Sequence, residues 1–207
     1  MNIKQNIGIL DLGLGNLRNV IKASEFFNLK TFLIKNGEDI KKIDKLILPG
    51  VGSFQHFAKN IEKNNLKQAI YEHIKKKKYL LGICLGMQVL NNKSYEDGEY
   101  EGLKLINRDV VELKTIDKNI ITPNFGWYEI KKKSTDRNFF DHFVNRKFYF
   151  AHSFYCNSSD EHMDVFMNIN GNDVSAGFQY DNILGTQFHP ELSGNNGLEF
   201  YKNFFKL

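Results

Sequence analysis

Short apolar runs alternate with amphipathic stretches along the chain up to Asn91, and this alternation constrains the fold more than any other feature. The runs typical of buried strands are Asn6–Leu10, Thr31–Ile34, Lys45–Leu48 and Tyr79–Ile83. Helical spacing of apolar residues occupies Leu17–Phe27, Ile61–Lys77 and Leu85–Asn91. Strands that alternate with helices predict a parallel sheet covered by helices on both faces.

The pattern changes near Leu103, where short β-like runs become dominant. They are Asp109–Leu113, Gly126–Lys131, Lys147–Ala151, Asp164–Ile169, Ser175–Tyr180 and Ile183–Phe188. An amphipathic helix is expected near Gly197–Phe205, and no repeat or linker divides the chain. We therefore predict one α/β domain over residues 1–207, with an open, mostly parallel sheet, helices on both faces and antiparallel β additions.

Composition excludes several classes of protein. Hydrophobic residues make up 42% of the 207 residues and charged residues 25%, which is typical of a folded domain. The 28 Lys and Arg exceed the 24 Asp and Glu by only 4, so a nucleic-acid-binding face is not predicted. The lysine runs at 75–78 and 131–133 are either solvated ends of elements or a polyanion site.

The chain also lacks the signals of a membrane, secreted or cofactor-binding protein. No apolar stretch approaches the ~20 residues of a membrane span, and Ile7–Leu10 is too short for a signal sequence. Two cysteines without a CxxC motif predict neither a disulfide framework nor a zinc site. No phosphate-binding loop is present, and Gly13-x-Gly15 lacks the third glycine of a dinucleotide site. We expect a cytoplasmic protein without a metal or cofactor.

The segment Gly82–Gly86 has the pattern of a nucleophile elbow, because a buried strand leads directly into a helix with Cys84 at the junction. The flanking glycines allow the strand and helix backbones to approach closely. The N-terminal end of the helix favours the thiolate of Cys84. The alternative is a buried structural cysteine, which is the interpretation we give to Cys156, a strand thiol without such a context.

A thiol nucleophile requires a general base and a group that orients the base. His189 differs from the other five histidines because Pro190 and Glu191 follow it at a strand end. Proline favours extended backbone at the residue before it, and alternate residues of an extended chain face the same side. Glu191 can therefore reach His189, although the same three residues also occur as an ordinary strand end.

The oxyanion of an acyl transfer usually has two donors. The N–H of Leu85, directly after Cys84, is one candidate. Gly50-Val51-Gly52 follows a buried strand at the edge where ligands bind in α/β sheets, and it is the second candidate. An ordinary strand-to-helix turn would give the same Pro-Gly-x-Gly string.

These motifs together resemble the class I glutamine amidotransferase family. Its two signatures correspond to Gly82–Gln88 and Gln187–Glu191. Further strings are similar to one branch, the glutaminase subunit of imidazole glycerol phosphate synthase: Asp11–Leu17, Leu48–Gly52, Gly126-Trp127, Tyr149–Phe154 and Gly197-Leu198. The resemblance covers nearly the whole chain and implies a flavodoxin-like fold.

By this resemblance Cys84 attacks the side-chain amide of glutamine, and His189 and Glu191 complete a catalytic triad. It implies oxyanion donors at Leu85 and at Gly50, Val51 and Gly52, and substrate contacts from Gln88, His152, Ser153 and Phe154. It further implies that a (β/α)₈-barrel cyclase subunit receives the ammonia and faces Asn16, Arg18 and Trp127. Gln88 and Ser153 could instead be ordinary helix and strand residues, Asn16 a helix cap and Trp127 a core residue.

The chain departs from the branch at positions outside the triad. Leu12 replaces a tyrosine, Asn124 a histidine, Tyr128 an asparagine and Leu192 a lysine. The departures leave open a paralogue that donates ammonia to another acceptor, such as a surface sugar. A non-catalytic partner-binding subunit and a stand-alone cysteine hydrolase are further alternatives.

Overall fold

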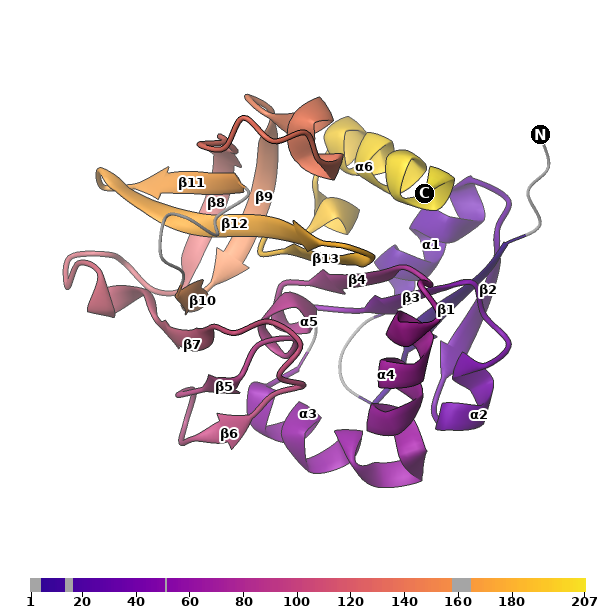
Figure 1. Cartoon of the computed structure of the whole chain (residues 1–207). Helices are drawn as coiled ribbons and strands as arrows, with labels where there is room; N and C mark the ends of the chain where they lie inside the picture. The colour runs from indigo at the N-terminus through magenta and orange to yellow at the C-terminus, as the bar shows by residue number, and fades with distance from the viewer. Residues whose placement is uncertain (1–4, 14–16, 51, 158–164) are drawn as a thin grey trace.

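The central element of the fold is a seven-stranded sheet with the order β11-β12-β13-β4-β3-β1-β2 (Figure 1). The computed structural model describes residues 5–13, 17–50, 52–157 and 165–207. The parallel strands are β1 (Asn6–Leu10), β2 (Lys30–Ile34), β3 (Lys45–Leu48), β4 (Leu80–Ile83) and β13 (Ile183–Thr186). The strands β11 (Val165–Ile169) and β12 (Asn172–Tyr180) extend one edge in antiparallel pairing. The prediction of an open, mostly parallel sheet with antiparallel additions is confirmed.

Helices cover both faces of this sheet, as the alternating sequence predicts (Figure 1). The helices on one face are α1 (Arg18–Phe26) and α6 (Gly194–Lys206), and those on the other are α2 (Gly37–Ile40), α3 (Phe54–Ile61) and α4 (Leu66–Lys75). Strand β3 shows how the sequence supplies both cores. Ile47 packs into the core under α1 and α6, whereas Leu46 and Leu48 pack under the opposite helices.

Two smaller sheets stand beside the main one. The four-stranded sheet has the order β10-β7-β5-β6, with β5 (Lys93–Ser94), β6 (Tyr100–Glu101), β7 (Asp109–Glu112) and β10 (Phe154–Asn157). The two-stranded sheet pairs β8 (Asn124–Glu129) with β9 (Lys147–His152). Short 3-10 helices lie at Lys63–Asn65, Leu113–Thr115, Phe139–Phe143 and Pro190–Leu192.

The predicted helix over 61–77 is wrong in its bounds. Asn64 and Asn65 adopt left-handed conformations, with φ of 55° and 57°, and separate α3 from α4. The spacing of Phe54, Phe57 and Ile61 behind the capping residue Ser53 belongs to α3, which the sequence analysis did not recognise. The predicted helix over Leu85–Asn91 corresponds to α5 (Leu85–Gln88), and the last strand ends at Thr186 rather than Phe188.

Candidate active site

Cys84 occupies a strained bend between β4 and α5. Its φ of 48° and ψ of −106° lie outside the usual regions for a residue with a Cβ, and its N–H donates a 2.6 Å hydrogen bond to the carbonyl of Thr186. The flanking glycines are required by close contacts. A Cβ on Gly82 would lie 2.5 Å from the carbonyl oxygen of Gly86, and a Cβ on Gly86 would lie 1.9 Å from that of Leu48.

His189 and Glu191 lie beside this bend. His189 is extended, with φ of −101° and ψ of 96°, and Pro190 begins the 3-10 turn that carries Glu191. Nδ1 of His189 donates to Oε1 of Glu191 at 2.8 Å, which leaves Nε2 for Cys84. A Cβ on Gly50 would lie 2.8 Å from Cβ of Cys84 and 3.0 Å from Cε1 of His189, so both residues border one glycine. The structure brings the three residues together.

The surroundings of His189 favour its charged form. Burial disfavours the imidazolium, but the hydrogen bonds with Cys84 and Glu191 outweigh burial and raise the pKa of His189 to about 10. An imidazolium at neutral pH stabilises a negative charge on the neighbouring sulfur. This arrangement can therefore supply a nucleophilic thiolate and a proton donor at the same place.

Cys84 opens into a cavity of about 260 Å³. The predicted site residues that line it are Gly50, Gly52, Cys84, Leu85, Gln88, His152, Ser153 and Phe154. Val51 lies outside the described residues. The other lining residues are not predicted from the sequence; they are Glu96, Pro123, Phe125 and Ala151.

Hydrogen bonds fix two polar side chains of the cavity wall. The carbonyl of Phe154 accepts from Nε2 of Gln88 at 3.0 Å and from Nδ1 of His152 at 2.8 Å. Burial, together with the charge of His189, lowers the pKa of His152 to about 4. His152 is therefore neutral near pH 7, and its Nε2, a buried acceptor, has no hydrogen-bond partner among the described residues.

Glu96 is the acidic residue in this cavity wall. Its Oε2 accepts a 3.0 Å hydrogen bond from the N–H of Phe54, which holds the carboxylate at the start of α3. A carboxylate in this place can bind a cationic group that enters the cavity. Glu96 follows the short strand β5 of an added sheet, and no local motif in the sequence marks it.

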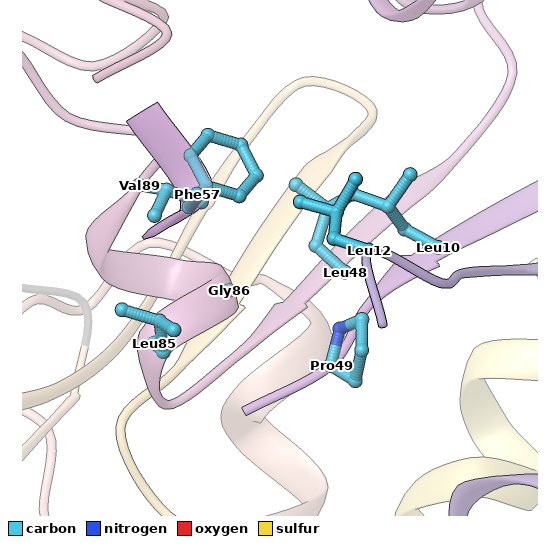
Figure 2. Close-up of a pocket in the computed structure, with 8 residues that line it drawn as sticks. All are labelled: Leu10, Leu12, Leu48, Pro49, Phe57, Leu85, Gly86 and Val89. Atoms are coloured by element: carbon cyan, nitrogen blue, oxygen red, sulfur yellow. The ribbon is translucent and has the colours of Figure 1, made fainter. Parts of the chain in front are cut away.

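A second, apolar hollow of about 20 Å³ lies beside Leu85 and Gly86 (Figure 2). Leu10, Leu12 and Leu48 line one side, and Phe57 and Val89 lie across from them. The volume is close to that of one water molecule, and apolar side chains dominate the lining. A polar substrate therefore fits the larger cavity at Cys84.

Two of the residues expected to face a partner, Arg18 and Trp127, lie near the turn that carries Glu191, Trp127 on the strand that pairs with β9. Arg18 is exposed at the start of α1, which packs against this turn. Trp127 is 53% exposed on β8 rather than a core residue, and its ring meets that of Tyr149 edge-on at 5.9 Å. Asn16 lies outside the described residues, and Leu17, not Asn16, is the N-cap of α1.

Two departures from the branch pattern contact each other. The hydroxyl of Tyr128 donates a 2.6 Å hydrogen bond to Oδ1 of Asn124, four positions earlier on β8. Leu12 lines the apolar hollow, and Leu192 is 43% exposed in the turn next to Glu191. Of these four residues, Leu192 is the exposed one.

Three further expectations concern Cys156, metal sites and membrane-spanning helices. Cys156 is fully buried in β10 and accepts a hydrogen bond from Nδ2 of Asn91 at 3.1 Å. Among the described residues, no group of three or more His, Cys, Asp or Glu could hold a metal ion. No helix in the described part of the chain is long and apolar enough to cross a membrane.

Comparison with known proteins places this site in a family. The family described as glutamine amidotransferase class-I matches residues 8–207. The chain belongs to this family. The resemblance inferred from the two signatures is therefore confirmed, and glutamine amidotransferase activity follows for the chain as a whole.

Two similar proteins carry the name of one branch. A Campylobacter jejuni (strain 81-176) protein named imidazole glycerol phosphate synthase subunit HisH 1 is 41% identical over 97% of this chain and 100% of its own length. A Caldanaerobacter subterraneus protein named imidazole glycerol phosphate synthase subunit HisH is 39% identical over 97% of this chain and 98% of its own length.

Solved structures of amidotransferases share the fold at low identity. A structure described as glutamine amidotransferase aligns with a TM-score of 0.73 and 16% identity over 96% of this chain and 98% of its own. PurLQS from Thermotoga maritima aligns with a TM-score of 0.75 and 16% identity over 99% of both chains. The predicted α/β fold class is confirmed.

Proposed function

We propose that this amidotransferase is the glutaminase subunit of an imidazole glycerol phosphate synthase. It hydrolyses glutamine to glutamate and delivers ammonia to a (β/α)₈-barrel cyclase subunit in histidine biosynthesis. The HisH relatives, at 41% and 39% identity over nearly full length, support this branch. The observation that carries the chemistry is the contact of Cys84, which lines the cavity, with His189, which is hydrogen-bonded to Glu191. Residues 1–207 form one domain in this proposal.

Cys84 begins the reaction. Its thiolate attacks the side-chain amide carbon of glutamine, and the amide oxygen becomes an oxyanion that accepts hydrogen bonds from the N–H of Leu85 and from the Gly50–Gly52 segment. The first N–H groups of a helix have no partner within the helix, which suits the Leu85 donor to this task. His189 gives its proton to the leaving nitrogen, so ammonia departs and a γ-glutamyl thioester remains.

Water completes the reaction. Neutral His189 takes a proton from the water that attacks the thioester carbon, and Glu191 stabilises the imidazolium that forms. The C–S bond breaks with its electron pair on sulfur, which releases glutamate and restores the pair of thiolate and imidazolium. Glu191 keeps the ring in place for both steps through the 2.8 Å bond to Nδ1.

The cavity wall supplies recognition of glutamine. Glu96 pairs with the α-ammonium group of the substrate, while Gln88, His152 and the Ser153–Phe154 backbone hold the rest of the amino acid. A carboxylate that neutralises an ammonium explains why the cavity carries an acidic residue away from the sulfur. Glu96→Gln should raise KM for glutamine at least tenfold, which corresponds to a loss of about 1.4 kcal/mol of binding free energy. The change in kcat should be smaller.

The cyclase subunit docks on the face formed by Arg18, Trp127 and the turn of Glu191. An exposed tryptophan beside the catalytic turn fits the anchors that dominate protein interfaces. Asn16 belongs to this proposed face by sequence. Leu192, exposed where the branch has a lysine, favours one second candidate, the same glutaminase paired with a synthase that amidates a different molecule.

The decisive experiment measures glutamate release from glutamine with and without the cyclase subunit of the same organism. Wild type should show release that rises with the partner, Cys84→Ala should show none, and the control Cys156→Ala should retain it. Release that Cys84→Ala leaves unchanged would refute the mechanism. Release stimulated only by another synthase would replace the first candidate with the second, and binding without release in wild type would indicate a non-catalytic subunit.

A further inference from the structure

The sulfur of Cys84 has a hydrogen-bond donor besides the imidazole. Nε2 of Gln187 lies 3.4 Å from Sγ of Cys84, and Gln187 is completely buried. Gln187 stands two positions before His189 on the segment that leaves β13. In extended backbone these two side chains face the same side, and both reach the sulfur.

A chain of hydrogen bonds determines which end of the Gln187 amide faces the sulfur. The carbonyl of Phe154 can only accept, so Gln88 must present its NH₂ group there, at 3.0 Å. The same NH₂ group donates to Oε1 of Gln187 at 3.2 Å. The other end of the Gln187 amide, its NH₂ group, is therefore turned toward Sγ.

The reversed orientation of Gln187 is unfavourable at both ends. It would place two NH₂ groups against each other at Gln88 and an amide oxygen against a sulfur that carries negative charge. Each clash would occur in a buried site, where unsatisfied polar groups are costly. The carbonyl of Phe154 thus determines the orientation of the Gln88 side-chain amide, which in turn determines the orientation of the Gln187 amide beside Cys84.

We propose that Gln187 is a further catalytic residue, whose side-chain N–H stabilises the thiolate of Cys84. This inference rests on the proposed glutaminase chemistry. The amide does not titrate, so it donates to the sulfur at every pH and exchanges no proton with it. It acts when the thiolate is formed before attack, and again when the C–S bond of the thioester breaks and the electron pair returns to Sγ.

With Gln187 as a donor, stabilising the sulfur and transferring a proton are tasks of two different residues. His189 must give its proton to the leaving nitrogen, so for part of the cycle it no longer stabilises the sulfur as a cation. Gln187 keeps its N–H throughout. Gln88 lines the glutamine cavity and donates a hydrogen bond to Oε1 of Gln187. The side-chain amides of Gln88 and Gln187 therefore connect the substrate cavity to the sulfur of Cys84.

The test compares Gln187→Met, which keeps the length of the side chain and removes the donor, with Gln187→Glu, which places a carboxylate beside the sulfur. The readout is the rate at which iodoacetamide alkylates Cys84 in the isolated chain between pH 5 and 10, located by mass spectrometry. Gln68→Met is the matched control for the chemical change, because Gln68 is exposed and its side chain donates a hydrogen bond to Glu72.

Gln187→Met should move the midpoint of the alkylation profile up by about one pH unit, and Gln187→Glu should move it further. With the cyclase subunit present, kcat of Gln187→Met should fall about tenfold, with KM changed less than threefold. A Gln187→Met profile that superimposes on wild type overturns the proposal, even if kcat falls, because the amide would then only fill space. If Gln187→Met does not fold, the alkylation profile of Gln187→Glu is used instead, and a profile that superimposes on wild type again overturns the proposal.

The alkylation assay needs neither glutamine nor a partner. A shifted profile in a protein that no synthase activates would support Gln187 and reject the proposed function. An unshifted profile in an active glutaminase would reject Gln187 alone.

Discussion

The hydroxyl of Ser193 donates a 2.6 Å hydrogen bond to the main-chain carbonyl of His189 and accepts a 3.0 Å bond from the N–H of Tyr149. The N–H of His189 in turn donates to the carbonyl of Tyr149 at 2.9 Å. The backbone that carries the imidazole is thus tied to β9 directly and through a buried hydroxyl. The exposed ring of Trp127 touches the same tyrosine, so the proposed partner face adjoins this connection.

Ser193→Ala should lower kcat for glutamine hydrolysis about tenfold, since a misplaced imidazole transfers protons poorly. The free energy of unfolding should fall by about 1–3 kcal/mol, because two buried main-chain groups lose a partner. Urea denaturation and steady-state kinetics check both values. Ser175→Ala is the control, because Ser175 is equally buried and its hydroxyl has no partner among the described residues. Equal effects of the two substitutions would contradict the positioning role.

Gly50→Ala should reduce kcat about a hundredfold, because the added Cβ would lie too close to Cβ of Cys84, the carbonyl oxygen of Ile83 and the imidazole of His189 and must displace them. Gly171→Ala is a control of a different kind. A Cβ there meets nothing within 4 Å, but φ is +85°, so this variant should lose about 1–2 kcal/mol of stability and keep its activity. Full activity in Gly50→Ala would refute the close approach of Cys84 and His189.

Acid should destabilise the fold through His73, which is 3% exposed on α4 far from Cys84. Burial lowers the pKa of His73 to about 4, whereas the unfolded chain protonates near 6.5. Between these values the unfolded state binds more protons, so stability is present above pH 6.5 and is lost as the pH falls toward 4.

His73→Gln removes this contribution and keeps an N–H for the carbonyl of Tyr79, which His73 contacts at 3.1 Å. From pH 7 to 5 the wild type should lose about 2 kcal/mol more than the variant. Urea denaturation at both pH values measures the difference. Parallel losses in the two proteins would show that His73 titrates normally.

Trp127→Ala should weaken binding of the cyclase subunit about thirtyfold, as expected for a central aromatic anchor. Alkylation of Cys84 in the isolated chain should not change. Phe26→Ala is the matched control, because Phe26 is a 65% exposed aromatic residue at the end of α1 opposite Arg18. Isothermal titration calorimetry measures the affinity of each variant for the cyclase subunit. Equal affinities for the two variants would show that the partner binds another face.

The sequence predicts the bend at Cys84, the contact of Glu191 with His189 and much of the main sheet because these depend on local rules. A strand period of two places Glu191 beside His189, and two glycines identify the bend at Cys84. The same period places Gln187 toward the sulfur, but an amide has no titration to attract notice. Glu96 could not be predicted, since its position depends on how a small added sheet folds back over α3.

The ends of helices and strands were less predictable where the conformation of one or two residues determines them. Asn64 and Asn65 interrupt an apolar helical pattern by adopting positive φ, which asparagine tolerates but does not require. The last strand ends before Phe188 because the segment after Thr186 turns to β9, a contact made by residues distant in sequence.

The position of β13 in the sheet has a consequence for synthesis on the ribosome. This strand pairs with β4, so the residues that we propose to activate Cys84 emerge more than a hundred positions after it. A nascent chain that has exposed the cysteine still lacks its imidazole, its carboxylate and the Gln187 amide. In the proposed mechanism the thiol therefore stays unactivated until the segment around His189 has also been synthesised and has paired with β4.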